Sequence, residues 1–205
     1  MPTVQLRSSL PAVDGVVALI AKGGELPAGV PWATLGVTGE PGQSAVLPSG
    51  EKQVTAWVVT AAEPTAEQQR RAVAQGLRAL AKSTKVGIDP SGLPNPDLAA
   101  IAEAAVLTTY SYLAYKSAES QKSATTVSTI TIVSADARKA AAKKAVAEAV
   151  AVAEATCLAR DWVNTPPADL RPPAFAEAIK DTAAKGVRVT IWDEKRLAKE
   201  NCGGI

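Results

Sequence analysis

Residues 160–173 read RDWVNTPPADLRPP, so two pairs of prolines follow directly on a long alanine-rich segment. Pro166 disfavours the α conformation at Thr165, and Asn164 suits the end of a helix, so we expect the preceding helix to stop there. Pro173 suits the first turn of a new helix. The sequence therefore predicts a break between two structural units at this junction.

Downstream of the junction, the pattern predicts a helix, a strand and a second helix, over residues 173–185, 187–192 and 194–201. Asp193 suits the N-cap of the second helix, Gly186 the end of the first, and Gly203 and Gly204 the end of the second. No sheet accompanies this unit, and the chain stops at Ile205, where a further strand would follow. We therefore expect residues 165–205 to be a truncated second α/β domain.

Upstream of the junction, residues 136–164 are predicted to form one long helix. Its bulky apolar side chains do not share a single stripe; they are Val146, Val150, Val152, Cys157, Leu158 and Trp162. A helix that is apolar on several sides is typical of one enclosed between two bodies. We expect residues 136–164 to link two domains.

Residues 1–135 alternate strand-like and helix-like patterns. Strands are predicted over TVQLRSS, GVVALIA, KQVTAWVVT, KVGID and TVSTITIVS, and helices from Glu67 onward and over residues 95–117, opened by Asn95 or Asp97. The glycines of TGEPGQS fit neither a Walker A motif nor GxGxxG, so that segment is interpreted as a turn. Strands separated by helices indicate a layered α/β domain with a largely parallel or mixed sheet.

The composition excludes several classes of protein. Apolar residues make up 47% of the chain and no run approaches the length of a membrane span, while the N-terminus lacks the pattern of a signal peptide. We therefore expect a cytoplasmic protein. There is no histidine, which excludes Ser-His-Asp and Cys-His nucleophiles and any zinc site built on imidazole.

Charged residues suggest two candidate sites, each with a structural alternative. Four carboxylates near the junction could suggest a metal site, but they are better explained as helix-end and turn residues: Asp161, Asp169, Asp193 and Glu194. The helix that starts at Glu67 carries a basic stripe, made of Arg71, Gln75, Arg78 and Lys82, and the linker carries three lysines, Lys139, Lys143 and Lys144. Each group could contact nucleic acid or could simply face solvent. The net charge of only +2 favours solvated faces.

The segments ARDWVNTPPADLRPPAFAEAIK and GVRVTIWDEKRLAKENCGGI resemble the junction of the leucyl aminopeptidase (cytosol aminopeptidase) family, which carries an A-R-D-x-V-N-x-P-P-x-D-L-x-P pattern there. YSYLAYKS, residues 110–117, is similar to a second segment of the same family. Ala104 departs from the family's frequent glycine, which affects local packing only. Residues 1–90 resemble the family only in general layout.

The resemblance implies an α/β fold with a macro-domain-like N-terminal domain (residues 1–135), a linker helix (136–164) and the beginning of a C-terminal catalytic domain (165–205). Family members assemble as hexamers and remove N-terminal residues, preferably leucine, from peptides, using two divalent cations, zinc or manganese. Their metal ligands lie in K-G-x-x-F-D-x-G-G and N-T-D-A-E-G-R-L motifs, and this sequence contains neither. No residue is therefore assigned a catalytic, cofactor-binding or metal-binding role, and no cofactor is expected in this chain alone.

Two functions remain open from the sequence. In the first, the chain is the N-terminal part of an aminopeptidase and serves assembly and substrate access. In the second, it is an interaction module that binds nucleic acid through its basic faces. The two differ in salt dependence, because a phosphate-binding surface loses affinity steeply as salt rises.

The two cysteines, Cys157 and Cys202, give the first testable prediction. Two thiols are too few for a disulfide scaffold, and a reducing compartment would keep them reduced. After denaturation without reductant, both should react with a thiol reagent such as 5,5'-dithiobis(2-nitrobenzoate). A disulfide between them would contradict the cytoplasmic assignment.

Overall fold

The computed structural model describes residues 1–122 and 124–203. The chain divides into two compact units, Met1–Ala159 and Arg160–Ile205. The expected boundaries at residues 135 and 164 differ from this division and stay predictions. Cys157 and Cys202 form no disulfide in the described residues, and Cys157 is buried. In the described ranges, no helix combines the length and the apolar character needed to cross a membrane.

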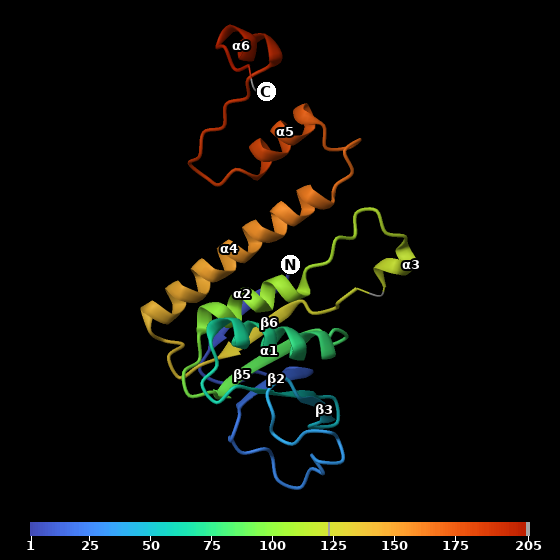
Figure 1. The fold of residues 1–205 in the computed structure, drawn as a ribbon, viewed down its shortest axis with the longest axis vertical. Helices are drawn as coiled ribbons and strands as arrows, with labels where there is room; N and C mark the ends of the chain where they lie inside the picture. The colour runs from blue at the N-terminus through green and yellow to red at the C-terminus, as the bar shows by residue number, and fades with distance from the viewer. Residues whose placement is uncertain (123, 204–205) are drawn as a thin grey trace. The chain divides into compact units, whose positions relative to one another are not determined.

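The first unit is built on one mixed sheet of six strands (Figure 1). The strands are β1 (Thr3–Arg7), β2 (Gly15–Ala21), β3 (Ser44–Pro48), β4 (Val54–Thr60), β5 (Lys85–Gly92) and β6 (Thr129–Val133). Their spatial order is β1-β6-β5-β2-β4-β3, and every pair is parallel except β3 with β4. The predicted α/β fold with a mixed sheet is confirmed.

Strand β2 is the centre of the sheet, between β4 and β5. All seven of its residues are buried, which matches its uninterrupted apolar sequence GVVALIA. Because successive side chains of a strand point to opposite faces, Val17 and Leu19 lie on one face while Ala18 and Ile20 lie on the other. Both faces of β2 must therefore be covered by other parts of the chain.

Two helices cover the first face, α1 (Ala66–Ala79) and α2 (Leu98–Thr109), which Figure 1 shows side by side against the strands. One core cluster joins them to the sheet and to the long helix α4 (Ala140–Asn164), and its members include Val17, Leu19, Val58, Val73, Leu77, Ile88, Ile101 and Val146. Gly76 of α1 lies directly on Val17, because a Cβ at this position would overlap the methyl groups of that valine. The absence of a side chain at Gly76 lets α1 approach β2 closely.

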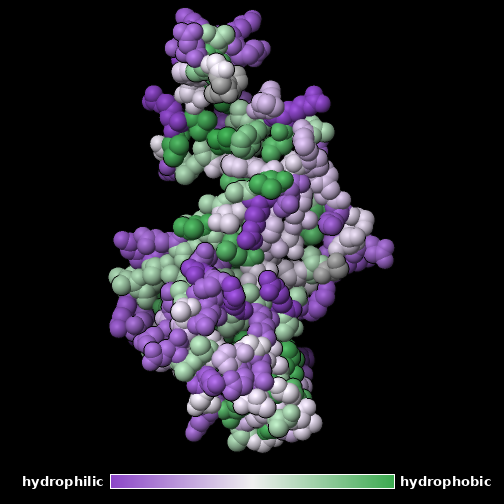
Figure 2. Space-filling model, viewed as in Figure 1, coloured by the Kyte–Doolittle hydropathy of each residue, from purple (hydrophilic) through white to green (hydrophobic). Residues whose placement is uncertain are grey.

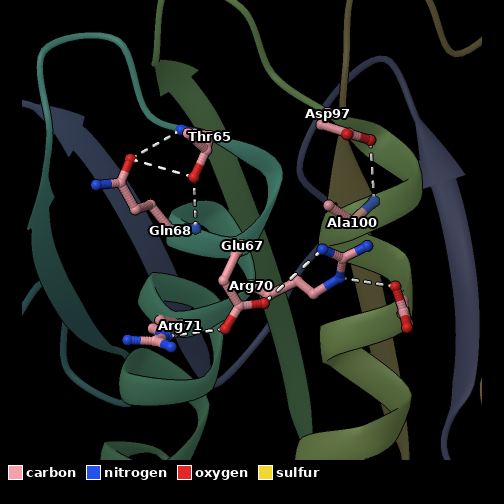
Figure 3. Close-up of polar contacts among 8 residues, drawn as sticks. Thr65, Glu67, Gln68, Arg70, Arg71, Asp97 and Ala100 are labelled. Atoms are coloured by element: carbon pink, nitrogen blue, oxygen red, sulfur yellow. Dashed lines mark hydrogen bonds and ion pairs between the residues drawn. The ribbon is translucent and has the colours of Figure 1, made fainter.

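Polar contacts fix where these two helices begin (Figure 3). Thr65 and Gln68 form a capping box at the start of α1, and Asp97 accepts a hydrogen bond from the Ala100 amide at the start of α2. Between the helices, Arg70 Nε lies 2.7 Å from a carboxylate oxygen of Glu103. The sequence left Asn95 and Asp97 as alternative caps, and the structure selects Asp97.

A buried amide, that of Gln69, ties the two helix starts together. Its Nε2 donates to the carbonyl oxygens of Pro64 (3.2 Å) and Asn95 (3.0 Å), and its Oε1 accepts from the Asp97 amide at 2.8 Å. Gln69 is only 2% exposed. All three of these hydrogen bonds are to backbone groups. The amide thus satisfies backbone groups that the turns before α1 and α2 would otherwise leave unpaired.

Among the described residues, loops rather than helices cover the second face of β2. Leu10 packs over Gly87 of β5, where a Cβ would collide with it. Trp32 packs edge-on against Trp57 of β4, with ring centroids 6.2 Å apart, and its indole nitrogen donates to the Pro27 carbonyl at 2.8 Å. Trp32 therefore anchors the segment after β2 over the sheet.

In the second unit, α5 (Pro172–Thr182) and α6 (Glu194–Lys199) are joined by extended chain. Trp162 packs edge-on against Phe175, with centroids 5.1 Å apart. None of its described residues, 160–203, is buried. The strand predicted over 187–192 is absent, because the described part of this unit offers no second strand for it to pair with.

Some element boundaries also differ from the prediction. No strand was predicted over SAVLP, which follows the segment interpreted as a turn, yet it forms the edge strand β3 by pairing with β4. The helix predicted over 95–117 ends at Thr109, since Tyr110 is extended and the Thr109 hydroxyl donates to backbone carbonyls of the last turn. A short helix, α3 (Ala118–Gln121), follows with Ser117 as its cap. The linker helix begins at Ala140 rather than at residue 136. Gly204, which was predicted to end the last helix, lies outside the described residues.

Gly76 gives a prediction of stability. In an exposed helix interior, Gly→Ala usually stabilises by up to about 1 kcal/mol. Here Gly76→Ala should instead lower the free energy of unfolding by about 1–3 kcal/mol, because the new methyl group overpacks against Val17. Urea denaturation measures the change. In the double variant Val17→Ala/Gly76→Ala, the cost should be smaller than the sum of the single costs; strict additivity would contradict the contact.

The contrast in burial between the units predicts where proteases cut. Because residues 160–203 lack buried residues while the first unit has a continuous core, limited trypsin digestion should cleave first between Thr165 and Gly186. Lys180 and Lys185 are sites there, whereas the bond after Arg171 precedes Pro172 and resists trypsin. Intact-mass measurement should then find a fragment that retains residues 1–160. Equal resistance along the whole chain would contradict the prediction.

Candidate functional site

The four carboxylates near the junction occupy structural positions. Asp193 caps α6 by accepting a hydrogen bond from the Arg196 amide at 2.9 Å, and Glu194 lies in the first turn of that helix. Asp161 lies in α4, and the Asp169 amide donates to the Pro166 carbonyl in the turn before α5. Among the residues that the structure describes, no three or more Asp, Glu, Cys or His side chains are grouped as metal ligands would be.

The basic stripe on α1 is partly neutralised by local contacts. Arg71 pairs with Glu67 at 2.8 Å. The Gln75 amide donates to the Gly42 carbonyl (2.9 Å) and to the Ser44 hydroxyl (2.8 Å), and Lys82 donates to the Lys122 carbonyl at 3.3 Å. These contacts direct much of the stripe toward the protein itself and weaken the case for phosphate binding.

The lysines at the start of α4 show a similar pattern. Lys139 pairs with Asp136 at 2.8 Å, and Lys144 lies 3.8 Å from Glu148. Lys143 is exposed. Surface pairs of this kind are worth little in stability, but they reduce the local positive field that a nucleic acid would meet.

A cavity of about 750 Å³ lies on the face of the sheet that the loops cover. Its walls include Trp57 of β4 and Asp89 of β5, and its floor includes Ala18 of β2. Strand register sets these three residues in one row, because Ala18 pairs with Trp57 on one side and with Asp89 on the other. The small alanine between the two large side chains leaves room above it.

The rim of this cavity comes from the segment after β2, residues 24–28, which includes Glu25. On the β5 side, Ser91 and Gly92 complete it. The Ser91 amide donates to Asp89 Oδ1 at 2.9 Å, which holds the carboxylate in place. The row of Trp57, Ala18 and Asp89 lies near the middle of the strands, and the lining extends from there to the carboxyl ends of β2 and β5.

Sequence reasoning assigned no role to these residues. Asp89 ends the strand predicted from KVGID, but β5 continues to Gly92, so Asp89 lies within the strand and its position on the cavity face could not be read from that pattern. The proximity of Trp57 and Asp89 depends on β2 lying between β4 and β5, which the chain order does not reveal.

The second unit has a groove of about 390 Å³ lined almost entirely by apolar side chains, including Ile179, Ile191, Trp192 and Leu197. Arg196 stacks over the Trp192 ring at 4.5 Å from its centroid. Figure 2 shows apolar surface in the part of the chain that contains α5. The described part of this unit has no buried residue, so these apolar side chains remain partly exposed in the groove.

Comparison with known proteins agrees with the resemblance in the sequence. Residues 32–119 match the model of the cytosol aminopeptidase family, N-terminal domain. The probable cytosol aminopeptidase of Streptomyces coelicolor is 35% identical in an alignment of 232 positions, gaps included, which covers 94% of this chain and 45% of that protein. The match therefore includes most of both units.

Solved structures give the same result. The bottromycin maturation enzyme BotP in complex with Mn has a TM-score of 0.68 and 32% identity over 83% of this chain and 36% of that one. A mutant of tomato leucine aminopeptidase has a TM-score of 0.73 over 98% of this chain and 46% of that one. Its identity is 13%, so it shows a shared fold only.

In every one of these matches the chain spans less than half the length of the other protein. The family model covers β3, β4, β5 and the helices α1 and α2, together with the YSYLAYKS segment at residues 110–117. By sequence and by fold, this chain belongs to the cytosol (leucyl) aminopeptidase family and carries its N-terminal region.

Proposed function

We propose that this chain is the N-terminal portion of a metal-dependent leucyl aminopeptidase that works in the cytoplasm. The whole enzyme removes N-terminal residues from peptides, and the part described above serves assembly and substrate access. The observation that carries this proposal is the match to the Streptomyces coelicolor aminopeptidase across 94% of the chain at 35% identity. A match of that extent crosses the junction, so it involves both units and not the N-terminal domain alone.

In this proposal, hydrolysis belongs to the part of the matched aminopeptidases that this chain does not cover. Two-metal hydrolysis needs several carboxylates converging on one cleft. The described residues contain no such group, so they do not fit a pair of divalent cations. BotP was solved with Mn, which supports manganese as one metal of the whole enzyme, with zinc as the alternative from the family resemblance.

The second unit supports the proposal through its exposed apolar groove. Ile191 and Trp192 are 41% and 38% exposed, and Phe175 and Ile179 are each 36% exposed. Apolar surface of this kind is expected where a unit packs against further structure. We propose that residues 165–205 begin the catalytic domain and that its remaining part covers this groove.

A segment of the first unit supports a role in assembly. Residues 110–122 leave the body of the sheet and carry α3 (Figure 1). Within this segment Tyr112 and Tyr115 stack with centroids 6.0 Å apart, and Tyr115 is 55% exposed. Tyrosines are enriched at protein interfaces. We propose that this segment contacts neighbouring chains in a hexameric enzyme.

Activity of the isolated chain tests the proposal. The purified 205-residue chain should release no product from leucine p-nitroanilide in the presence of Mn²⁺ or Zn²⁺, because no described group of carboxylates can hold the metals. The whole enzyme should hydrolyse the same substrate under the same conditions. Absorbance of released p-nitroaniline measures both reactions.

The control is a chelator, which should abolish the reaction of the whole enzyme. Turnover by the isolated chain that a chelator abolishes would show a metal site within it and overturn the assignment of catalysis to other residues. Absence of any peptidase activity from the whole enzyme, across a panel of peptides and metals, would overturn the proposed function itself.

A further inference from the structure

The cavity above Ala18 has no part in the function proposed above. Trp57, Ala18 and Asp89 stand in one row across β4, β2 and β5. Because neighbouring strands lie about 4.8 Å apart, the two outer backbones are separated by roughly 10 Å. An indole and a carboxylate thus face a common space whose floor carries only a methyl group.

The charge of this space is negative. Asp89 and Glu25 both line it, and its described lining contains no lysine or arginine. The nearby Lys22 is directed elsewhere, since its ammonium pairs with Glu40 at 2.7 Å. A phosphate or carboxylate ligand would therefore be repelled by these two carboxylates, with no basic side chain in the lining to offset the repulsion. A cation would instead gain a charge-assisted hydrogen bond.

Asp89 is prepared for such a bond. Its Oδ1 accepts the Ser91 amide at 2.9 Å, which fixes the direction of the carboxylate. That single bond leaves further acceptor capacity on the carboxylate, because an ionised carboxylate offers about four lone-pair sites. The Ala18 side chain neither donates nor accepts hydrogen bonds, so the floor of the cavity does not compete with a ligand for the Asp89 carboxylate.

The other wall supplies an aromatic surface. Trp57 is half-buried and is held against the sheet by its edge-on contact with Trp32. A tryptophan side chain offers a large apolar surface against which the apolar part of a ligand can pack. The volume, about 750 Å³, is within the range of small-molecule sites.

From this geometry we propose that the cavity between Trp57 and Asp89 binds a small organic cation, a protonated amine carried on an apolar body. The ammonium group donates to Asp89, and the apolar body packs over Ala18 against the indole of Trp57. The site lies within the first unit and requires neither metal nor the rest of an aminopeptidase.

Three probes of similar shape and different charge test the proposal: benzylammonium, benzyl alcohol and benzoate. Each is titrated at constant ionic strength into the isotope-labelled 205-residue chain, and amide and indole resonances are followed by NMR. Benzylammonium should shift the signals of Ser91, Gly92 and the Trp57 indole in a saturable way. Benzyl alcohol should bind at least about tenfold more weakly, because it lacks the charge-assisted bond, and benzoate should not bind.

Asp89→Asn is the decisive variant, because its amide oxygen can still accept the Ser91 amide while the charge is removed. It should weaken benzylammonium binding at least about tenfold and leave benzyl alcohol binding unchanged. Glu25→Gln, on the exposed rim, should weaken it less. Glu51→Gln is the matched control: this exposed carboxylate precedes β4 and does not line the cavity, so its loss should have no effect.

Equal affinity for benzylammonium and benzyl alcohol would overturn the proposal, as would shifts spread over the surface without saturation. Tighter binding of benzoate than of benzylammonium would show an anion site instead. Unchanged benzylammonium binding in a folded Asp89→Asn variant would remove Asp89 from the site and overturn the proposal as stated. None of these results bears on the aminopeptidase assignment, which is tested by hydrolysis.

Discussion

The burial of strand β2 is the constraint on which the first unit depends. All seven of its residues are buried, so the chain must cover both faces of the strand at the centre of the sheet. On one face it uses α1 and α2, and the lack of a side chain at Gly76 allows α1 to lie directly on Val17. The alternatives, a gap or an overpacked contact, would each cost stability because protein interiors are close-packed.

The second face is covered in a different way, and this difference creates the cavity. Loops anchored by Trp32 and Leu10 cover it instead of helices. Loops fill space less completely than a packed helix pair, and a floor of Ala18 between Trp57 and Asp89 leaves a space that nothing in the core occupies. Polar and charged groups at its edge give it a chemistry that the apolar core on the other face lacks.

The two units differ in how much apolar core their own residues form. The first has a continuous core that joins the sheet to α1, α2 and α4. The second has α5 and α6 around an apolar groove and no buried residue in its described part. This contrast agrees with membership of a family whose matched proteins are more than twice as long. The division between the two units lies within α4, between Ala159 and Arg160.

The sequence by itself determined the α/β class, five of the six strands, the two helices on the sheet and the family, because apolar periodicity, caps and prolines act locally. It did not determine β3, which is a strand only because β4 offers an edge, nor could it place a strand over residues 187–192 without a partner. The cavity could not be predicted from the sequence either. Trp57 and Asp89 are far apart in the chain, and only the order of strands across the sheet brings them to either side of Ala18.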